Sequence, residues 1–205
     1  MSAVVLWVIV ASGLLMLISR RRSVCIVLVA IQSLLIGVAA LVAAPARSSA
    51  FATAAVILVV KAVGITFFMA LAVRRTHERT RVQADLDPLA RLAITLVGVV
   101  LFELLLPPLP FLTSQQQQGT IALLGLGFAM VLTRRATLLQ LLGILMCENA
   151  VALAAVCAPG GIPVIIELGA AADVIVFCSV GLAFHQRIFA VLGTGDSANM
   201  RELRD

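Results

Sequence analysis

Two carboxylates lie near the middle of long apolar stretches. Burying a charge there costs free energy, but a carboxylate in such a place can bind and release protons. Glu148 occupies the centre of QLLGILMCENAVALAAVC, and Asp173 follows a run of small residues in IIELGAAADVIVFC. A carboxylate at the centre of a membrane helix costs a few kcal/mol on insertion scales, and such residues usually face a polar pathway. Glu148 and Asp173 are therefore the leading functional candidates.

Three more charged residues extend this set. Lys61, in VILVVKAVGITFF, lies about ten residues from either end of its stretch, roughly 15 Å at 1.5 Å per residue, which is too deep for easy snorkelling. Glu103 lies nearer the end of its stretch, where water or headgroups reach it. Glu167 precedes Asp173 by six residues, so the two point about 120° apart on a helix and address different neighbours.

Burial gives these side chains a shared chemistry. Desolvation raises the pKa of a carboxyl group and lowers that of a lysine, so a buried Lys and Glu can exchange protons near neutral pH. Gln32, Gln140 and Asn149 are candidate polar neighbours, although packing bonds between helices explain them equally well. For Lys61 and Glu148 the structural alternative is a fixed buried ion pair.

The composition predicts an all-α, polytopic membrane protein. Of 205 residues, 62% are apolar and 12% are charged, and the mean hydropathy is +1.14. The net charge of +5 comes from arginines between apolar segments, which indicate membrane topology rather than a nucleic-acid surface. There is no nucleophile paired with a base and no phosphate-binding loop. The cysteines are scattered through the predicted spans without the spacing of metal ligands, which is typical of thiols that only take part in packing. We therefore expect no catalytic site, metal or bound cofactor in this chain. The cysteines are Cys25, Cys147, Cys157 and Cys178.

About seven spans are expected, because a bilayer core needs about 20 apolar residues per helix. The polar stretch 74–89 should lie in water, and residues 190–205 form a short soluble tail after a single transmembrane domain, 1–189. The N-terminus lacks a leading basic region, so it should remain as the first span. The spans run approximately over 2–19, 24–44, 51–73, 90–109, 118–133, 137–158 and 162–188.

The basic residues predict an orientation. They cluster in every second connection and in the tail, whereas the opposite connections contain only Arg47. The positive-inside rule then places the N-terminus outside and the C-terminus in the cytoplasm. The clustered residues are Arg20–Arg22, Arg74, Arg75, Arg79, Arg81, Arg91, Arg134, Arg135, Arg187, Arg201 and Arg204.

A weak internal repeat is also present. A span, a double arginine, a span ending in Ala-Pro and a span with a central polar residue occur twice, 113 to 114 residues apart and in the same orientation. Real duplication and chance similarity between apolar helices are about equally supported. A real repeat would pair 1–73 with 118–189, make 90–109 a connector, and make Lys61 the approximate counterpart of Asp173.

The chain resembles hydrogenase-4 membrane component E. The similarity is carried by TLLQLLGILMCENAVALAA, by IIELGAAADVIVFCSVGL, and by VILVVKAVGITFFMALAVRR, which is similar to the lysine-bearing helix of that family. It covers the whole chain in length and span order. It is most specific in the Cys-Glu-Asn of the sixth span and in the Glu-Leu-Gly followed by Asp in the seventh.

This resemblance implies a small bacterial inner-membrane subunit of a group 4 [NiFe] hydrogenase-type complex, a relative of respiratory complex I. Its last three spans are similar to the K subunit of complex I, so Glu148 would take the place of the first carboxylate and either Glu167 or Asp173 that of the second. Antiporter-like membrane subunits and a soluble hydrogenase-type arm would be the partners, with nickel–iron and iron–sulfur centres in those partners.

The implied role is proton translocation coupled to a redox module through Lys61, Glu148 and Asp173, with Glu167 and Glu103 as outer links. A scaffold subunit, whose charges only set the register of helices, is the alternative from another class. A subunit of a multisubunit cation/proton antiporter is a third. A self-sufficient transporter is disfavoured, because short loops offer little for substrate selection.

Overall fold

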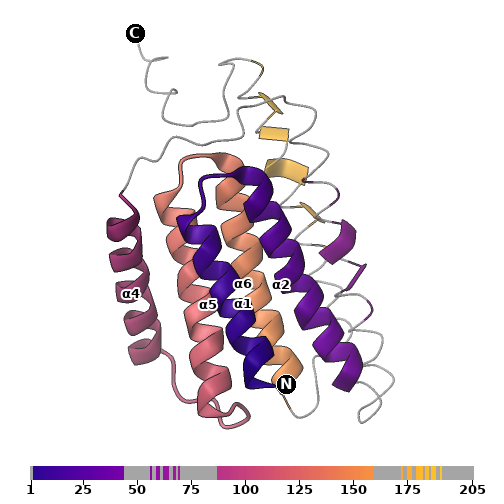
Figure 1. The fold of residues 1–205 in the computed structure, drawn as a ribbon, viewed down its shortest axis with the longest axis vertical. Helices are drawn as coiled ribbons and strands as arrows, with labels where there is room; N and C mark the ends of the chain where they lie inside the picture. Colours follow the sequence, from indigo (N-terminus) through magenta and orange to yellow (C-terminus); the bar gives the residue numbers. More distant parts are fainter. Residues whose placement is uncertain are drawn as a thin grey trace.

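The computed structural model describes residues 2–43 and 87–158 continuously, together with scattered positions between 56 and 69 and between 172 and 190. Within these residues every regular element is a helix, which agrees with the all-α prediction (Figure 1). The continuous helices are α1 (Ala3–Ile18), α2 (Arg22–Ala43), α4 (Pro88–Leu105), α5 (Ser114–Thr133) and α6 (Thr137–Cys157).

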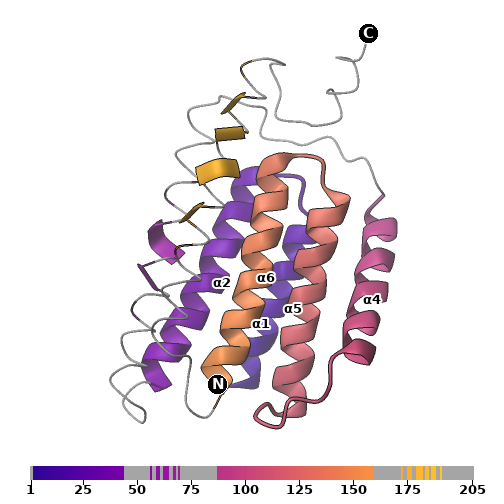
Figure 2. The same cartoon turned by 180° about the vertical axis from the view of Figure 1, so that it is seen from behind.

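Two helical hairpins, α1–α2 and α5–α6, pack face to face. α1 lies beside α5 and α2 lies beside α6, while α4 covers the outer side of α5 (Figures 1 and 2). α1 and α5 run in one direction, and α2, α4 and α6 run in the other. The two hairpins correspond to parts of the two proposed repeat copies and have the same orientation. The duplication itself stays a prediction.

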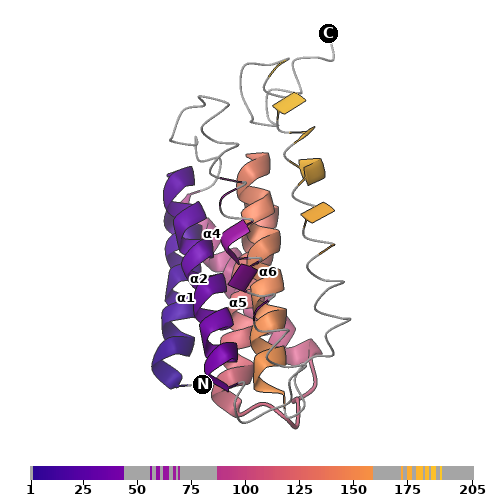
Figure 3. The ribbon, with the colours of Figure 1, turned by 90° about the vertical axis from the view of Figure 1, so that its right-hand side faces the viewer.

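The predicted spans 51–73 and 162–188 are described only at scattered positions, which are helical. Val59 lies against Gly37 of α2, where an added Cβ would meet the Val59 side chain at 2.7 Å. Gly181 lies against Leu141 of α6 in a similarly close contact. Described positions from both stretches thus flank the two hairpins (Figure 3).

Two predicted helix boundaries were wrong for identifiable reasons. α5 begins at Ser114 rather than at 118, because Thr113 and Gln116 form a reciprocal capping box that draws the glutamines into the first turn. α4 ends at Leu105 rather than at 109, because Pro107 lacks an N–H and disfavours helical geometry in the residue before it.

Two of the described helices, α2 and α6, are long and apolar enough to cross a membrane, and α1 is a shorter apolar helix. Large apolar side chains also face outward along the described helices, as a lipid-facing surface requires. These features agree with a membrane protein, and the count of seven spans stays a prediction. Strongly exposed examples are Val4, Leu96, Val97, Leu104, Leu132 and Val151.

Glycines set the closest helix contacts, and most of them lie on α5 or face it. A Cβ on Gly127 would lie 2.8 Å from the Gly143 carbonyl oxygen of α6 and 2.8 Å from the Cys147 nitrogen. Gly125 faces Val99 of α4, and Gly119 faces Leu6 of α1. Small residues allow membrane helices to approach this closely, so α5 contacts three neighbours through three different glycines.

Candidate functional site

Glu148 lies near the middle of α6 and is half-buried. It is the charged residue of a helix that is otherwise built from apolar, small and neutral polar side chains. Its neighbour Asn149 is turned about 100° further around the helix and is only 4% exposed. The carboxylate therefore lies at the edge of the bundle, and the adjacent amide points into it.

Asn149 connects α6 to α2 through two side-chain hydrogen bonds. Its Oδ1 accepts from Ser33 Oγ at 2.9 Å, and its Nδ2 donates to Gln32 Oε1 at 3.5 Å. Gln32 is completely buried, so the bond from Asn149 satisfies an amide oxygen that has no access to water. Such bonds between helices stabilise packing in an apolar surrounding.

Gln32 extends the network to α1. Its Nε2 donates to the Ile9 carbonyl oxygen at 3.0 Å and lies 3.8 Å from Met146 Sδ. Ser12 Oγ donates to the same carbonyl at 2.7 Å. Gly13 makes room for the amide, since a Cβ there would lie 3.2 Å from Gln32 Nε2. Three helices thus meet at one neutral polar cluster beside Glu148.

This cluster consists of amides, hydroxyls and a backbone carbonyl, none of which changes charge near neutral pH. The cluster therefore fixes the rotation of α6 about its own axis and does not store a proton. Because consecutive helix residues keep a constant angle between them, anchoring Asn149 to α2 also fixes the direction in which Glu148 points. Asn149 is therefore a positioning residue for the carboxylate.

Replacing Asn149 with leucine is expected to destabilise the protein by about 1–3 kcal/mol, because the buried Gln32 amide oxygen and the half-buried Ser33 hydroxyl would both lose their partner. Chemical unfolding in mild detergent measures this loss. Val151→Ala is the matched control on α6, since Val151 faces outward, and it should stay within about 0.5 kcal/mol. Equal stabilities of the two variants would contradict the anchoring role.

Of the other predicted site residues, Glu103 alone lies in the part of the chain that the structure describes. Lys61, Glu167 and Asp173 lie outside the described residues. Glu103 is exposed on α4, which packs on α5 and is separated by it from α6 (Figure 2). Gln140, the third candidate polar neighbour, donates to the Val131 carbonyl of α5 at 3.5 Å instead.

Cys25 and Cys147 contact neighbouring helices, in agreement with the predicted role of the cysteines in packing. Cys25 Sγ lies 3.7 Å from the Met16 carbonyl oxygen, and Cys147 Sγ lies 3.8 Å from that of Leu124. Cys25 and Cys147 are free thiols, and Cys178 lies outside the described residues. In the part of the chain described, no three His, Cys, Asp or Glu side chains are grouped to hold a metal ion.

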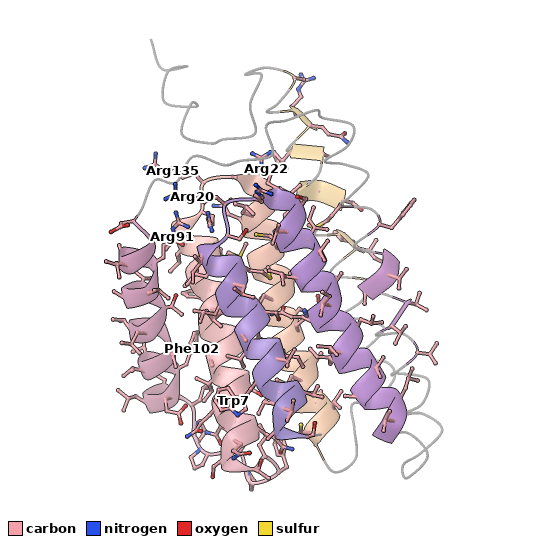
Figure 4. The ribbon with its side chains drawn as sticks, viewed as in Figure 1. Trp7, Arg20, Arg22, Arg91, Phe102 and Arg135 are labelled. Atoms are coloured by element: carbon pink, nitrogen blue, oxygen red, sulfur yellow. The ribbon has the colours of Figure 1, made fainter. Side chains whose placement is uncertain are left out.

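Arginines gather at one end of the bundle, where Arg20, Arg22, Arg91 and Arg135 lie together (Figure 4). The connection between α4 and α5 at the other end, residues 106–113, contains no charged residue. The charge separation that the sequence predicted between alternate connections is therefore present in the described helices. Trp7 lies toward the uncharged end (Figure 4).

Arg134 lies in the connection between α5 and α6, and its side chain caps the C-terminal end of α1. Its Nη2 donates to the carbonyl oxygens of Leu17 at 2.7 Å, Ser19 at 2.6 Å and Met16 at 3.4 Å. Arg91 Nη1 donates to the Leu17 carbonyl at 3.3 Å. Helix ends leave such carbonyls without intrahelical partners, and their negative dipole end favours a cation.

Burial makes these arginines an electrostatic feature as well. Arg134 is 3% exposed and Arg91 is 1% exposed. Burial, and to a lesser extent the neighbouring positive charge of Arg91, lower the pKa of Arg134 to about 10. The guanidinium group still carries its charge at neutral pH, so it can hold the end of α1.

Sequence reasoning missed Ser33, Ser12 and the capping role of Arg134. Ser33 directly follows Gln32, and Ser12 precedes Gly13 within an apolar stretch, so both were visible as polar residues in apolar surroundings. Arg134 was identified only as a topology signal. Its partner carbonyls belong to residues more than 110 positions away, which no local pattern indicates.

No protein-family model matches this sequence, and no solved structure matches it. Uncharacterized protein Rv0085 of Mycobacterium tuberculosis (strain ATCC 25618 / H37Rv) is 31% identical to the chain over 96 residues. The match covers 47% of this chain and 44% of that protein, so the similarity is local and spans less than half of either.

Proposed function

We propose that this chain is a small integral membrane subunit of a complex I-like, group 4 hydrogenase-type complex, and that Glu148 takes part in proton translocation coupled to a redox module in partner subunits. The observation that carries the proposal is that the half-buried Glu148 carboxylate lies in the middle of an apolar helix, whose rotation is fixed by the hydrogen bonds of the neighbouring Asn149. Intramembrane carboxylates placed in this way usually belong to ion or proton pathways.

The chain's own contribution is to hold a proton at the Glu148 carboxyl group and to pass it on. Lys61 and either Asp173 or Glu167 are the proposed further links within the membrane, and Glu103 is the proposed outer link. Nickel–iron and iron–sulfur chemistry belongs to the proposed soluble arm, and antiporter-like subunits are the proposed membrane partners.

The proposed location is the bacterial inner membrane, with the arginine end in the cytoplasm and the N-terminus outside. The gathering of arginines at one end of the described helices supports this orientation. Outward-facing apolar side chains support insertion in the bilayer. Seven spans, of which the last three resemble the complex I K subunit, remain part of the proposal.

Replacing Glu148 with glutamine is expected to leave assembly intact and to lower proton translocation by roughly 100-fold, because the amide keeps the shape but cannot hold the proton. Proton uptake by inverted membrane vesicles measures the translocation. Affinity purification through a C-terminal tag measures assembly, and nickel and iron analysis of the same sample tests for the redox arm. Asp87→Asn is the matched control, with an expected change below about twofold, because Asp87 is an exposed carboxylate at the start of α4 and has no place in the proposed path.

Unchanged translocation by an assembled Glu148→Gln complex would refute the proton role. The scaffold alternative predicts reduced assembly with unchanged translocation per assembled complex, and the close contact between Gly127 and Gly143 favours it as the second candidate. Antiporter-like partners without nickel or iron would instead support a cation/proton antiporter.

A further inference from the structure

The arginine end of the bundle carries a large excess of positive charge. Among the described residues at this end, six are arginines, and the carboxylate among them is Asp87, the N-cap residue of α4. The arginines come from the connection between α1 and α2, from the first turns of α2 and α4, and from the connection between α5 and α6. They are Arg20, Arg21, Arg22, Arg91, Arg134 and Arg135.

Two buried arginines meet at the end of α1. Arg91 Nη1 and Arg134 Nη2 both donate to the Leu17 carbonyl oxygen, at 3.3 and 2.7 Å. Nε and Nη1 of Arg134 are enclosed and donate to no acceptor in the described chain. Burial, and after it the positive charges of Arg91 and Arg20, lower the pKa of Arg134 to about 10. Among the described residues no carboxylate acts on Arg134, so its charge is not neutralised by an acid.

Two exposed arginines accompany the buried pair. Arg20 follows the end of α1 and acts on Arg134 through its charge, and Arg135 is next to Arg134 in the chain. Figure 4 draws Arg20, Arg91 and Arg135 at the same corner of the bundle. A negatively charged group outside the bundle can contact the two exposed side chains, while the two buried ones attract it through their charge. These four residues are the arginine cluster.

The surface next to the arginine cluster is apolar and faces outward. Ile18, the last residue of α1, is 44% exposed, and Ile94, about one turn after Arg91 on α4, is 37% exposed. The bond from Arg91 to the Leu17 carbonyl joins α4 to the end of α1, so both isoleucines border the cluster. A phospholipid presents the matching chemistry, since its charged headgroup and its acyl chains are joined.

We propose that the arginine cluster binds the headgroup phosphate of an anionic phospholipid, whose acyl chains lie along Ile18 and Ile94. The inference rests on the proposed membrane location but not on the proton role of Glu148. Free inorganic phosphate would match the arginines but would leave the isoleucines uncovered. Each basic residue near a membrane surface raises the affinity for anionic lipid roughly fivefold, so the two exposed arginines together should contribute roughly 25-fold.

Native mass spectrometry of the purified full chain in mild detergent gives the dissociation constants of bound lipids. Phosphatidylglycerol is compared with phosphatidylcholine of the same acyl chains, which has the phosphate but no net charge. We expect phosphatidylglycerol to bind roughly 25-fold more tightly. Arg20→Gln with Arg135→Gln should reduce this preference by at least about tenfold, whereas lysine at both positions should retain most of it, because the positive charge is kept.

A second double variant separates this site from general attraction by charge. Arg21→Gln with Arg187→Gln removes the same net charge from two exposed positions outside the cluster, and it should change the preference by less than about twofold. Equal losses in the two glutamine variants would overturn the site. Equal binding of the two lipids to the unaltered chain would also overturn it and would leave the membrane location standing.

Heating the unaltered chain in detergent tests the lipid against a free anion without any substitution. Phosphatidylglycerol should raise the Tm more than an equal concentration of phosphatidylcholine or of inorganic phosphate, because a ligand that binds the folded chain stabilises it according to its affinity. An equal rise with inorganic phosphate would show that a free anion suffices and would overturn the lipid assignment.

Discussion

Replacing Gly143 with leucine is expected to destabilise the protein by more than about 3 kcal/mol and to prevent folded protein from accumulating. A Cβ at Gly143 would lie 2.9 Å from the Gly127 carbonyl oxygen and 3.0 Å from the Val131 nitrogen. Both are backbone atoms, so no side chain can turn aside, and α5 and α6 would have to separate. Size-exclusion chromatography and unfolding in mild detergent measure the effect.

Gly98 on α4 provides the matched control, because nothing lies within 4 Å of a Cβ built there. Gly98→Leu should be neutral or stabilising by up to about 1 kcal/mol, since leucine favours a helix over glycine. Gly143→Ala should fall between the two leucine variants. Comparable stability of Gly143→Leu and Gly98→Leu would show that the α5–α6 contact does not determine the packing.

Replacing Arg134 with alanine is expected to cost about 2–4 kcal/mol, because three carbonyl groups near the end of α1 lose the charged donor that holds them. Thermal and chemical unfolding in detergent measure the loss. The lowered pKa of Arg134, about 10, means that the charged form is disfavoured by folding. Near neutral pH the guanidinium is charged in both the folded and the unfolded chain, so the free-energy cost of burying it does not change with pH. The free energy of unfolding should rise only as the pH passes upward through about 10, where the folded chain loses this proton before the unfolded chain does.

Exposed Arg21 lies in the connection between α1 and α2, and Arg21→Ala should change stability by less than about 0.5 kcal/mol. Arg134→Lys should retain part of the stability, since an ammonium group still donates to carbonyls. Arg134→Met removes the donor while filling similar space. Wild-type stability of Arg134→Met would mean that the three carbonyl bonds make no net contribution.

The predictions for Gly143 and Arg134 concern the contacts that position the helix carrying Glu148. Gly143 and Gly127 set the distance between α5 and α6, and α6 carries both Glu148 and Asn149. Arg134 fixes α1, whose Ile9 carbonyl accepts from Gln32 at the far side of the polar cluster. Loss of either contact should therefore alter the position of Glu148 as well as the stability of the bundle.

The sequence by itself determined the approximate positions of the described helices and which end of the bundle is basic. Apolar length predicted α1, α2 and α6 to within two residues at each end, because a run of about 20 apolar residues is needed to cross a bilayer. Arginine spacing predicted the charged end. The place of Glu148 in the middle of α6 followed from counting along the same run.

Only the tertiary structure decided which helix faces meet. A helix that is apolar on every side has no single stripe directed at the core, so periodicity does not indicate its neighbours. The pairing of Asn149 with Ser33 and Gln32, and the reach of Arg134 to α1, join residues more than 110 positions apart. Such contacts depend on how whole helices pack, and that packing is set by glycine positions on several helices at once.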